Sequence, residues 1–282
     1  MTCLANAIEL RNITKRFGQV VANKSISLEL HKGEILSLLG ENGSGKTTLM
    51  NMLSGIYYPD EGQIFVDGKE VEIRSPKDAF DLHIGMIHQH FKLVDVFTAA
   101  ENIILGLPGD KGKMDKTAVA KAVREIADRY GFDIDPNQKI YEMSVSQKQT
   151  VEIVKVLYRG ADILILDEPT AVLTPQETEK LFTVMRNMKK DGKAIIIITH
   201  KLHEVLAVSD RVAVLRKGEY IGDTDTATAS QQSLTDMMVG RAVSLNIDRP
   251  LNENQTERLK VEHLTVKLSL IHISEPTRPR LI

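Results

Sequence analysis

The 282-residue chain carries short, strongly apolar runs that alternate with amphipathic stretches. The densest runs, "ADILIL" (161–166) and "AIIIIT" (194–199), have the length and β-branched content of strands buried on both faces, as in a parallel sheet. Further buried strands are predicted over 34–40 and 211–216, with helical patterns between them. This alternation predicts an α/β domain built on a parallel sheet.

A second pattern predicts an addition to this core. "GQIFVDGKEVEI" (62–73) alternates between apolar and polar residues around Asp67-Gly68, which is the signal of a tight β-hairpin. Strands are also predicted around 7–13 and 20–30. Together they predict an antiparallel β subdomain beside the parallel core.

The segment from about 97 to 159 has a helical pattern, which is clearest in "TAVAKAVREIADRYG" (117–131). Strand patterns lie on both sides of it, and they resume at 161–167. An α-helical subdomain is therefore predicted as an insertion into the α/β domain, which spans residues 1–245.

The chain changes character after this domain. A polar stretch rich in Pro and Asn predicts a linker at 246–257. "LKVEHLTV" (259–266) then echoes "IELRNITK" (8–15), although an eight-residue echo also arises by coincidence. Residues 258–267 are accordingly expected to form the first strand of a second, missing copy of the domain.

The final residues, 268–282, fit neither copy of the pattern. "LSLIHISEPTR" (268–278) resembles the conceptual translation of a transposase sequencing adapter, and a natural tail is the alternative. On the adapter interpretation the native sequence ends near Lys267, and the chain is truncated after its first domain. The tail is then not part of the native fold.

Composition and charge narrow the protein class. Proteins that bind nucleic acid usually carry a basic surface, and the formal net charge of −2 therefore does not favour a nucleic-acid partner. The single cysteine, Cys3, excludes a disulfide framework and fits a reducing compartment. No apolar run approaches the roughly 18–20 residues that span a bilayer, and the N-terminus lacks the features of a signal peptide. A cytoplasmic protein is predicted, with any membrane role supplied by a partner.

"GENGSGKTT" (40–48) satisfies G-x-x-x-x-G-K-[ST], directly after a predicted strand and at the start of a helix predicted over about 45–54. Glycines let the backbone curl until successive N–H groups point at phosphate oxygens. Lys46 supplies a cation for the phosphates and Thr47 a hydroxyl for Mg²⁺. A glycine-rich turn with an exposed lysine is the alternative. The predicted nucleotide-binding residues are Gly40, Glu41, Asn42, Gly43, Ser44, Gly45, Lys46, Thr47 and Thr48.

"ILILDEPT" (163–170) ends a predicted buried strand with two carboxylates. Asp167 is predicted to hold Mg²⁺, directly or through water, and Glu168 to polarise the attacking water. An acidic pair at a strand end is also common in a solvated loop. A phosphate-binding loop on a neighbouring strand favours the catalytic interpretation.

These motifs, with "MSVSQ" (143–147) between them where an LSGGQ signature would lie, resemble an ABC-type ATPase over roughly residues 7–245. The resemblance implies a P-loop NTPase fold with a RecA-like core, which binds ATP and Mg²⁺ and hydrolyses the ATP. It also implies that Gln89 senses Mg²⁺ and touches a membrane partner, that His200 contacts the γ-phosphate, and that Phe17 stacks on adenine. The residues that would face the nucleotide of an opposite ATPase domain are Ser144, Val145, Ser146 and Gln147.

Within this family, "HQHFKLVDVFTAAENIILG" (88–106) and "VEIVKVLYRGADILILDEPTAVLTPQE" (151–177) are similar to the tandem ATPases of simple-sugar and nucleoside importers. Those proteins fuse two ATPase domains in one chain. The resemblance implies integral-membrane permease subunits, an extracytoplasmic substrate-binding protein and a place at the cytoplasmic face of the membrane. The resemblance does not decide whether the transported substrate is a nucleoside or a simple sugar, although it favours a nucleoside.

Two positions depart from the family pattern. Thr174 stands where an aspartate is usual, and Thr174-Pro175-Gln176-Glu177 also has the form of a helix capping box. Val145 and Ser146 replace two adjacent glycines, and the spacing of Ser146 to Gln149 predicts that Ser146 caps the following helix. Because such domains close head-to-tail, the resemblance assigns Val145 and Ser146 to the weaker of two composite sites. Lys46, Glu168 and His200 belong to the hydrolytic one.

Three other functions fit parts of this pattern. A non-transport ABC ATPase acting on ribosomes or DNA would show basic extensions or a long helical arm between its domains. A P-loop kinase would lack the helix after the signature and the histidine at 200. A nucleotide-gated regulator that binds without turnover would not need Glu168 or His200.

Overall fold

The computed structural model of the chain describes residues 5–89, 91–107, 116–241 and 260. Two units, Met1–Val243 and Ser244–Ile282, divide the chain, and every helix and strand described here belongs to the first. The linker predicted at 246–257 and the tail at 268–282 lie outside the described residues. So does the repeat strand predicted at 258–267, apart from Lys260.

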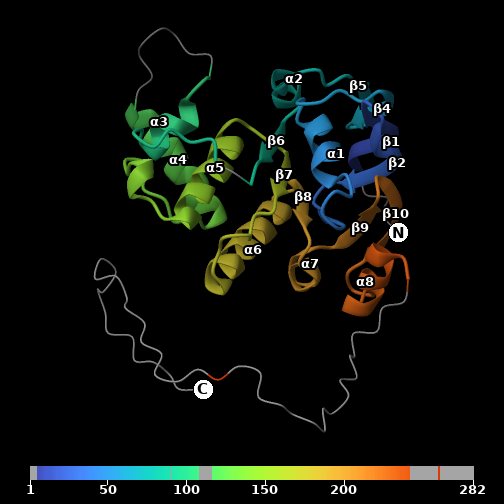
Figure 1. Ribbon diagram of the computed structural model, residues 1–282. Helices are drawn as coiled ribbons and strands as arrows, with labels where there is room; N and C mark the ends of the chain where they lie inside the picture. The colour runs from blue at the N-terminus through green and yellow to red at the C-terminus, as the bar shows by residue number, and fades with distance from the viewer. Residues whose placement is uncertain (1–4, 90, 108–115, 242–259, 261–282) are drawn as a thin grey trace. The chain divides into compact units, whose positions relative to one another are not determined.

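A six-stranded sheet forms the centre of the first unit (Figure 1). Its strands are β3 (Ile35–Leu39), β6 (Ile84–Ile87), β7 (Ile163–Asp167), β8 (Ala194–Thr199), β9 (Arg211–Arg216) and β10 (Glu219–Asp225). They lie in the order β10-β9-β3-β8-β7-β6, and all neighbours are parallel except β10 with β9. Asp167 lies opposite Ile198, and Leu39 lies opposite Thr199. The carboxyl ends of β3, β7 and β8 therefore meet at one edge of the sheet.

A four-stranded antiparallel sheet of order β2-β1-β4-β5 is built from β1 (Asn6–Phe17), β2 (Val20–His31), β4 (Glu61–Val66) and β5 (Lys69–Val71). Asp67 and Gly68 connect β4 to β5 with φ angles of 49° and 75°. Two positive φ angles are what a two-residue hairpin turn of this kind requires, so the predicted hairpin is confirmed. β1 extends beyond the predicted strand because, after several shifts of register, it stays paired with β2 as far as Phe17.

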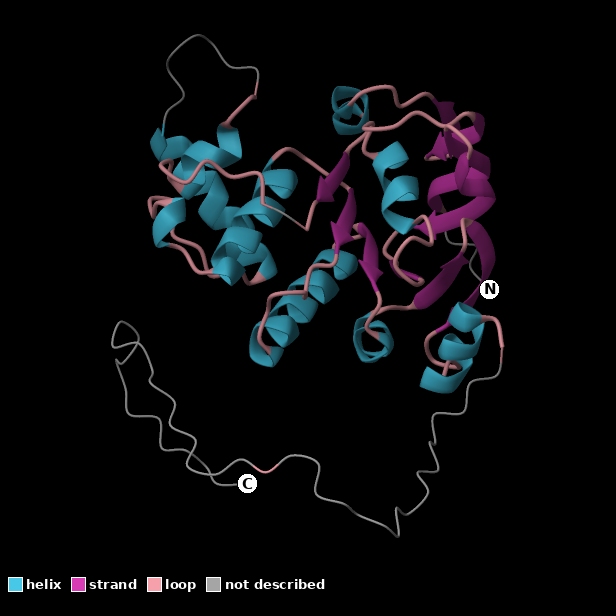
Figure 2. Cartoon of the chain, viewed as in Figure 1, coloured by secondary structure: helices cyan, strands magenta, loops and turns pink. Residues whose placement is uncertain are grey.

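Helices between β6 and β7 form a separate layer (Figure 2). They are α3 (Ala99–Ile104), α4 (Lys116–Tyr130), the 3₁₀ helix η1 (Ile140–Glu142) and α5 (Val145–Tyr158). This layer has its own core, in which Ile103 of α3, Val123 of α4 and Val154 of α5 are buried together. The predicted helical insertion is confirmed.

The remaining helices cover the central sheet or its ends. They are α1 (Lys46–Leu53), α2 (Pro76–Asp81), α6 (Pro175–Lys190), α7 (Leu202–Val208) and α8 (Gln231–Val239). The helix predicted at about 45–54 corresponds to α1.

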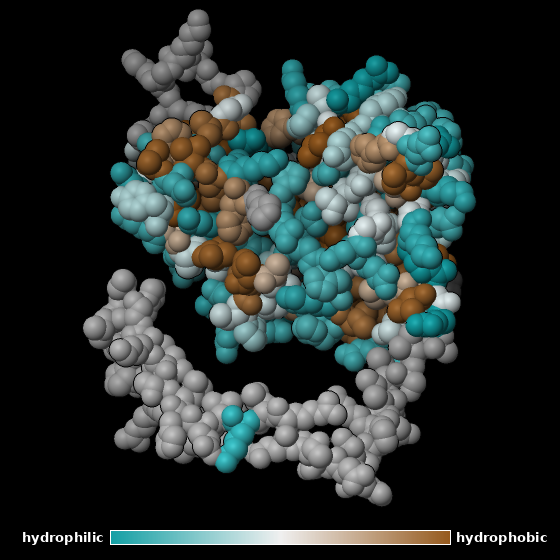
Figure 3. Space-filling model, viewed as in Figure 1, coloured by the Kyte–Doolittle hydropathy of each residue, from teal (hydrophilic) through white to brown (hydrophobic). Residues whose placement is uncertain are grey.

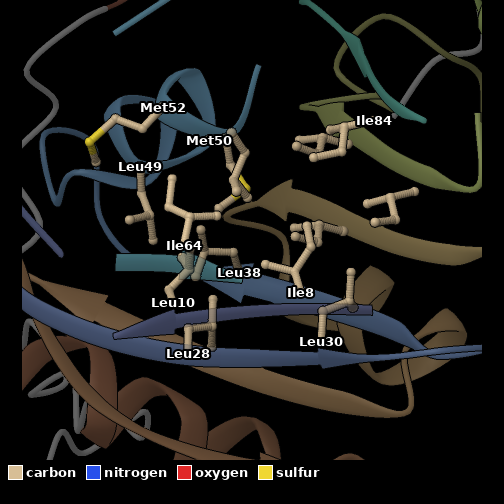
Figure 4. Packing of buried hydrophobic residues seen from close by; sticks show 14 of the residues in the cluster. Ile8, Leu10, Leu28, Leu30, Leu38, Leu49, Met50, Met52, Ile64 and Ile84 are labelled. Atoms are coloured by element: carbon tan, nitrogen blue, oxygen red, sulfur yellow. The ribbon is translucent and has the colours of Figure 1, made fainter. Parts of the chain in front are cut away.

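The central sheet is buried on both faces, which explains why its strands are apolar throughout. In β8, Ile196 belongs to the core shared with α1 and the antiparallel sheet, whereas its neighbour Ile195 belongs to the core shared with α6. Alternate side chains of a strand point to opposite faces, so both must be apolar. Figure 4 shows the first core, where Leu38, Met50 and Ile64 converge from three elements. The predicted α/β fold class is confirmed.

Hydrophobic residues on the face seen in Figure 3 form separate patches among hydrophilic side chains. Among the described residues, no helix combines the length and the apolar character needed to cross a membrane.

Candidate nucleotide-binding site

The carboxyl ends of β3, β7 and β8 open onto a cavity of about 660 Å³. The loop after β3 contributes Asn42, Gly43, Ser44 and Gly45, and α1 contributes Lys46, Thr47 and Thr48. The end of β7 contributes Asp167, and the loops after β6, β7 and β8 contribute Gln89, Glu168 and His200. The fold thus gathers residues that are distant in sequence, since Asn42 and His200, 158 positions apart, line the same cavity.

Two glycines of the loop after β3 are required by close backbone approach. A Cβ on Gly40 would lie 2.3 Å from the carbonyl oxygen of Leu215. A Cβ on Gly45, whose φ is 97°, would lie 2.5 Å from the carbonyl oxygen of Ala22. Gly45 is also the N-cap of α1 and provides no capping side chain, so the first N–H groups of α1 are left to a ligand.

Lys46 is folded across this loop and is buried. Its Nζ donates to the carbonyl oxygens of Gly40 at 2.7 Å and Glu41 at 2.9 Å. Burial lowers the pKa of Lys46, and the charges of Glu168 and Asp167 oppose that shift. A cation held by neutral carbonyls is ready to exchange them for anionic oxygens, because bonds between charged partners are stronger.

Thr47 and Asp167 lie together, with the threonine Oγ1 donating to the aspartate Oδ2 at 3.4 Å. Burial raises the pKa of Asp167, the charge of Glu168 raises it further, and Thr47 and Lys46 oppose the shift. A bound divalent cation would reverse this balance by favouring the ionised carboxylate. The hydroxyl and the carboxylate are the oxygen ligands that Mg²⁺ takes from proteins alongside substrate phosphates.

Glu168 and His200 form a pair at the mouth of the cavity. His200 Nδ1 lies 2.8 Å from Glu168 Oε1, and the histidine side chain is 53% exposed. The other carboxylate oxygen, Glu168 Oε2, is buried without a hydrogen-bond partner. A buried oxygen of this kind normally has a donor, and a water molecule beside a bound nucleotide would supply one.

Gln89 and Phe17 occupy different positions relative to the cavity. Gln89 lines it and is exposed. Phe17 is 43% exposed and lies outside the lining, although it pairs with Val20, which is part of the lining. The ring of Phe17 packs edge-on against Tyr57, with ring centroids 5.1 Å apart.

The predicted signature residues lie away from this cavity. Ser144, Ser146 and Gln147 line a second cavity of about 440 Å³, and Val145 is exposed. Ser144 caps α5: its Oγ accepts from Gln147 N, and Gln147 Oε1 accepts from Ser144 N.

The predicted cap at Ser146 is therefore wrong. Both serines have the S-x-x-Q spacing, but Ser144 has the extended backbone of an N-cap and Ser146 already lies within α5. The capping box predicted at Thr174 is confirmed, since Thr174 Oγ1 accepts from Glu177 N and Glu177 Oε2 accepts from Thr174 N.

Sequence reasoning missed two groups of residues that support the site. Asn23, which is fully buried in β2, donates from Nδ2 to the carbonyl oxygen of Gly45 at 3.1 Å. Thr170, Lys201 and Glu204 form a polar cluster behind the acidic pair. Asn23 is a single polar residue in a strand and Lys201 simply follows a histidine, so neither belongs to a recognisable sequence motif. Only the tertiary structure shows their roles.

Comparison with known proteins shows which family the chain belongs to. The chain is 50% identical over 263 residues to the nucleoside import ATP-binding protein NupA of Lactococcus lactis, covering 93% of this chain and 52% of that protein. It is 51% identical over 261 residues to the guanosine import ATP-binding protein NupO of Bacillus subtilis, covering 92% and 51%. The chain thus spans about half the length of these curated relatives.

Among solved structures, the ADP conformation of MJ1267, an ATP-binding cassette of an ABC transporter, aligns with a TM-score of 0.74 at 25% identity. The alignment covers 84% of this chain and 99% of that one. The family model described as "ABC transporter" matches residues 23–171, which is more than half of the chain. The chain belongs to the ABC transporter family of ATP-binding proteins.

Proposed function

We propose that this chain is the ATP-binding and ATP-hydrolysing part of an ABC importer, and that it couples hydrolysis to uptake through a permease. The observation that carries the proposal is the meeting of Lys46, Thr47, Asp167, Glu168 and His200 around one cavity. These residue types are the ones that phosphoryl transfer to water requires: a phosphate cradle, ligands for a metal, and a group that orients the nucleophile.

Each residue has a proposed task. The N–H groups at the start of α1 and the Lys46 ammonium bind the phosphates, and they neutralise charge that develops on them. Glu168 accepts a hydrogen bond from the attacking water, and His200 holds both Glu168 and the γ-phosphate. Phe17, beside the cavity, stacks on the adenine.

Thr47 and Asp167 are the proposed holders of Mg²⁺, with Gln89 nearby on the cavity wall. Among the described residues no cluster of three or more His, Cys, Asp and Glu side chains is suited to a metal. Mg²⁺ commonly binds through one or two protein carboxylates together with water and substrate phosphates. When bound, it would neutralise the phosphate charge.

The proposed partners follow from the relatives and from the position of the signature. Ser144, Val145, Ser146 and Gln147 lie apart from the cavity, so they are proposed to face the nucleotide of a second ABC domain. Permease subunits and an extracytoplasmic substrate-binding protein complete the proposed importer, with this chain at the cytoplasmic face of the membrane.

The cargo is proposed to be a nucleoside. Relatives at 50% and 51% identity carry names that specify nucleoside and guanosine import. Simple sugars are the alternative, which the sequence resemblance leaves open.

Binding of a fluorescent ATP analogue tests the proposal. Lys46→Ala removes a charged donor, so we expect affinity to fall by roughly tenfold or more. Lys69→Ala, on the exposed strand β5, is the matched control and should bind as the unsubstituted chain does. Phosphate release should rise more than linearly with protein concentration if a second chain must supply the signature. Equal ATP affinity in both lysine variants would contradict the site.

A further inference from the structure

A polar cluster of Thr170, Lys201 and Glu204 lies behind the acidic pair and outside the cavity lining. Lys201 Nζ donates to Thr170 Oγ1 at 3.1 Å and to Glu204 Oε1 at 3.0 Å. The Thr170 hydroxyl in turn donates to Glu204 Oε2 at 2.5 Å. Thr170 and Glu204 are 1% and 4% exposed, whereas Lys201 is partly buried and pairs its charge with Glu204.

This cluster joins the two chain segments that carry the acidic pair and the histidine. Thr170 follows Glu168 by two residues after β7, and Lys201 follows His200 directly after β8. Lys201 Nζ also donates to the backbone carbonyl oxygen of Thr170 at 3.0 Å. The segments after β7 and β8 are therefore linked to each other by residues that lie next to the cavity lining but are not part of it.

Glu168 and His200 both need such support. Glu168 has a φ of 48°, a left-handed backbone conformation that a residue with a side chain adopts only when its surroundings hold it there. Its N–H donates to the carbonyl oxygen of Ile198 at 2.9 Å, which fixes one side of the residue. His200 is more than half exposed, so little packing fixes its ring.

We propose that Lys201, Thr170 and Glu204 are positioning residues that hold Glu168 and His200 at their hydrogen-bonding distance, and thereby set the rate of ATP hydrolysis without contacting the nucleotide. The inference rests on the proposed ATPase function. Rates are sensitive to small displacements of a group that orients the nucleophile. Loss of the link should therefore lower kcat and leave ATP affinity unchanged.

The same two strands offer a matched control at their other ends. Lys193, directly before β8, donates from Nζ to Ala161 O at 2.9 Å and to Asp162 Oδ1 at 2.7 Å, directly before β7. Lys193 thus bridges β7 and β8 as Lys201 does, but at the edge of the sheet away from the cavity. Substitution there removes one ion pair, to Asp162, and one hydrogen bond to a backbone carbonyl oxygen. Lys201→Met removes the same two kinds of bond and one more, to the Thr170 hydroxyl.

The test compares Lys201→Met with Lys193→Met, and Thr170→Val with Thr170→Ser, in the chain as it stands. We expect kcat to fall roughly ten- to a hundredfold in Lys201→Met and Thr170→Val, with the Kd for ATP changed by no more than about twofold. Lys193→Met should keep its kcat even if its thermal stability drops. Thr170→Ser retains the hydroxyl and should recover most of the rate.

Two results would overturn the proposal. One is an unchanged kcat in both Lys201→Met and Thr170→Val, and the other is an equal loss in Lys193→Met. If the unsubstituted chain binds ATP without hydrolysing it, the proposed function fails, and hydrogen exchange then decides the positioning role. Lys201→Met should speed backbone exchange in the peptide 166–171 more than Lys193→Met does, and equal exchange would refute positioning.

Discussion

The Nδ1 atom of His200 lies 2.8 Å from the Oε1 atom of Glu168, and the two residues come from loops that follow adjacent parallel strands. The remaining carboxylate oxygen of Glu168, Oε2, is buried and has no hydrogen-bond partner among the described residues. One oxygen thus lies at hydrogen-bonding distance from the histidine, and the other is the one proposed to accept a hydrogen bond from the attacking water.

Glu168→Gln and His200→Ala should separate binding from turnover. We expect both variants to bind ATP with nearly unchanged affinity and to hydrolyse it roughly 10²- to 10⁴-fold more slowly, because a positioned base contributes about that much. Single-turnover phosphate release measures the step directly. His203→Ala, on the exposed side of α7, is the control for loss of an imidazole. Full turnover by Glu168→Gln would show that another group orients the water.

Asp167→Asn should stabilise the nucleotide-free protein while weakening its use of Mg²⁺. Burial raises the pKa of Asp167 above the ordinary value of 3.8, so between pH 3.8 and the folded-state pKa the folded state holds a proton that the unfolded state releases. The contribution of Asp167 to the free energy of unfolding is therefore fully present below pH 3.8, and it is lost as the pH rises through the folded-state pKa.

Thermal unfolding across pH checks this sign. At neutral pH the amide has no ionisation to oppose burial, so Asp167→Asn should unfold at a higher temperature than the unsubstituted chain. The difference should shrink as the pH falls towards 3.8. A variant that unfolds at a lower temperature at pH 7 would show that ionised Asp167 stabilises the fold.

Introducing glycines at residues 145 and 146 should weaken α5 without speeding hydrolysis at this chain's own cavity. Val145 and Ser146 are the first two residues of α5, and glycine in a helix costs up to about 1 kcal/mol per residue. Denaturant unfolding of Val145→Gly/Ser146→Gly should show a loss of that order. An increase in ATP affinity of Lys46's own cavity would contradict the assignment of this signature to an opposite site.

Thr174 offers a test of the second departure from the family pattern. Thr174→Ala should cost about 0.5–2 kcal/mol, because α6 loses its N-cap. Thr174→Asp keeps an N-cap oxygen and should be stable. Turnover in Thr174→Asp then reports on the aspartate alone. If Thr174→Ala unfolds at the same denaturant concentration as the unsubstituted chain, the cap is not a stabilising element.

The parts of the site that could be predicted from the sequence are those in which function is tied to contiguous residues. Gly40 to Thr48 form one turn whose chemistry depends on local spacing, and the strand that ends in Asp167 and Glu168 is defined by its own apolar run. Local spacing was ambiguous at α5, where two serines share the S-x-x-Q pattern and only backbone angles distinguish Ser144.

The supporting residues could not be predicted because their partners are distant in sequence. Asn23 lies 22 residues from Gly45, whose carbonyl oxygen it holds, and β2 brings it there only after the antiparallel sheet has formed. Lys201 reaches Thr170 across 31 residues and two neighbouring strands. Such contacts depend on the order of the strands in the sheet, which cannot be predicted from the residue types at these positions.

Lys46 binds the carbonyl oxygens of its own loop with the same ammonium that is proposed to meet the nucleotide. The loop is therefore held in its curled conformation by a cation from its own sequence. Capture of a nucleotide becomes an exchange of oxygen ligands around one nitrogen, and no folding of the loop has to precede it. Association kinetics should accordingly be a single phase whose rate rises linearly with nucleotide concentration.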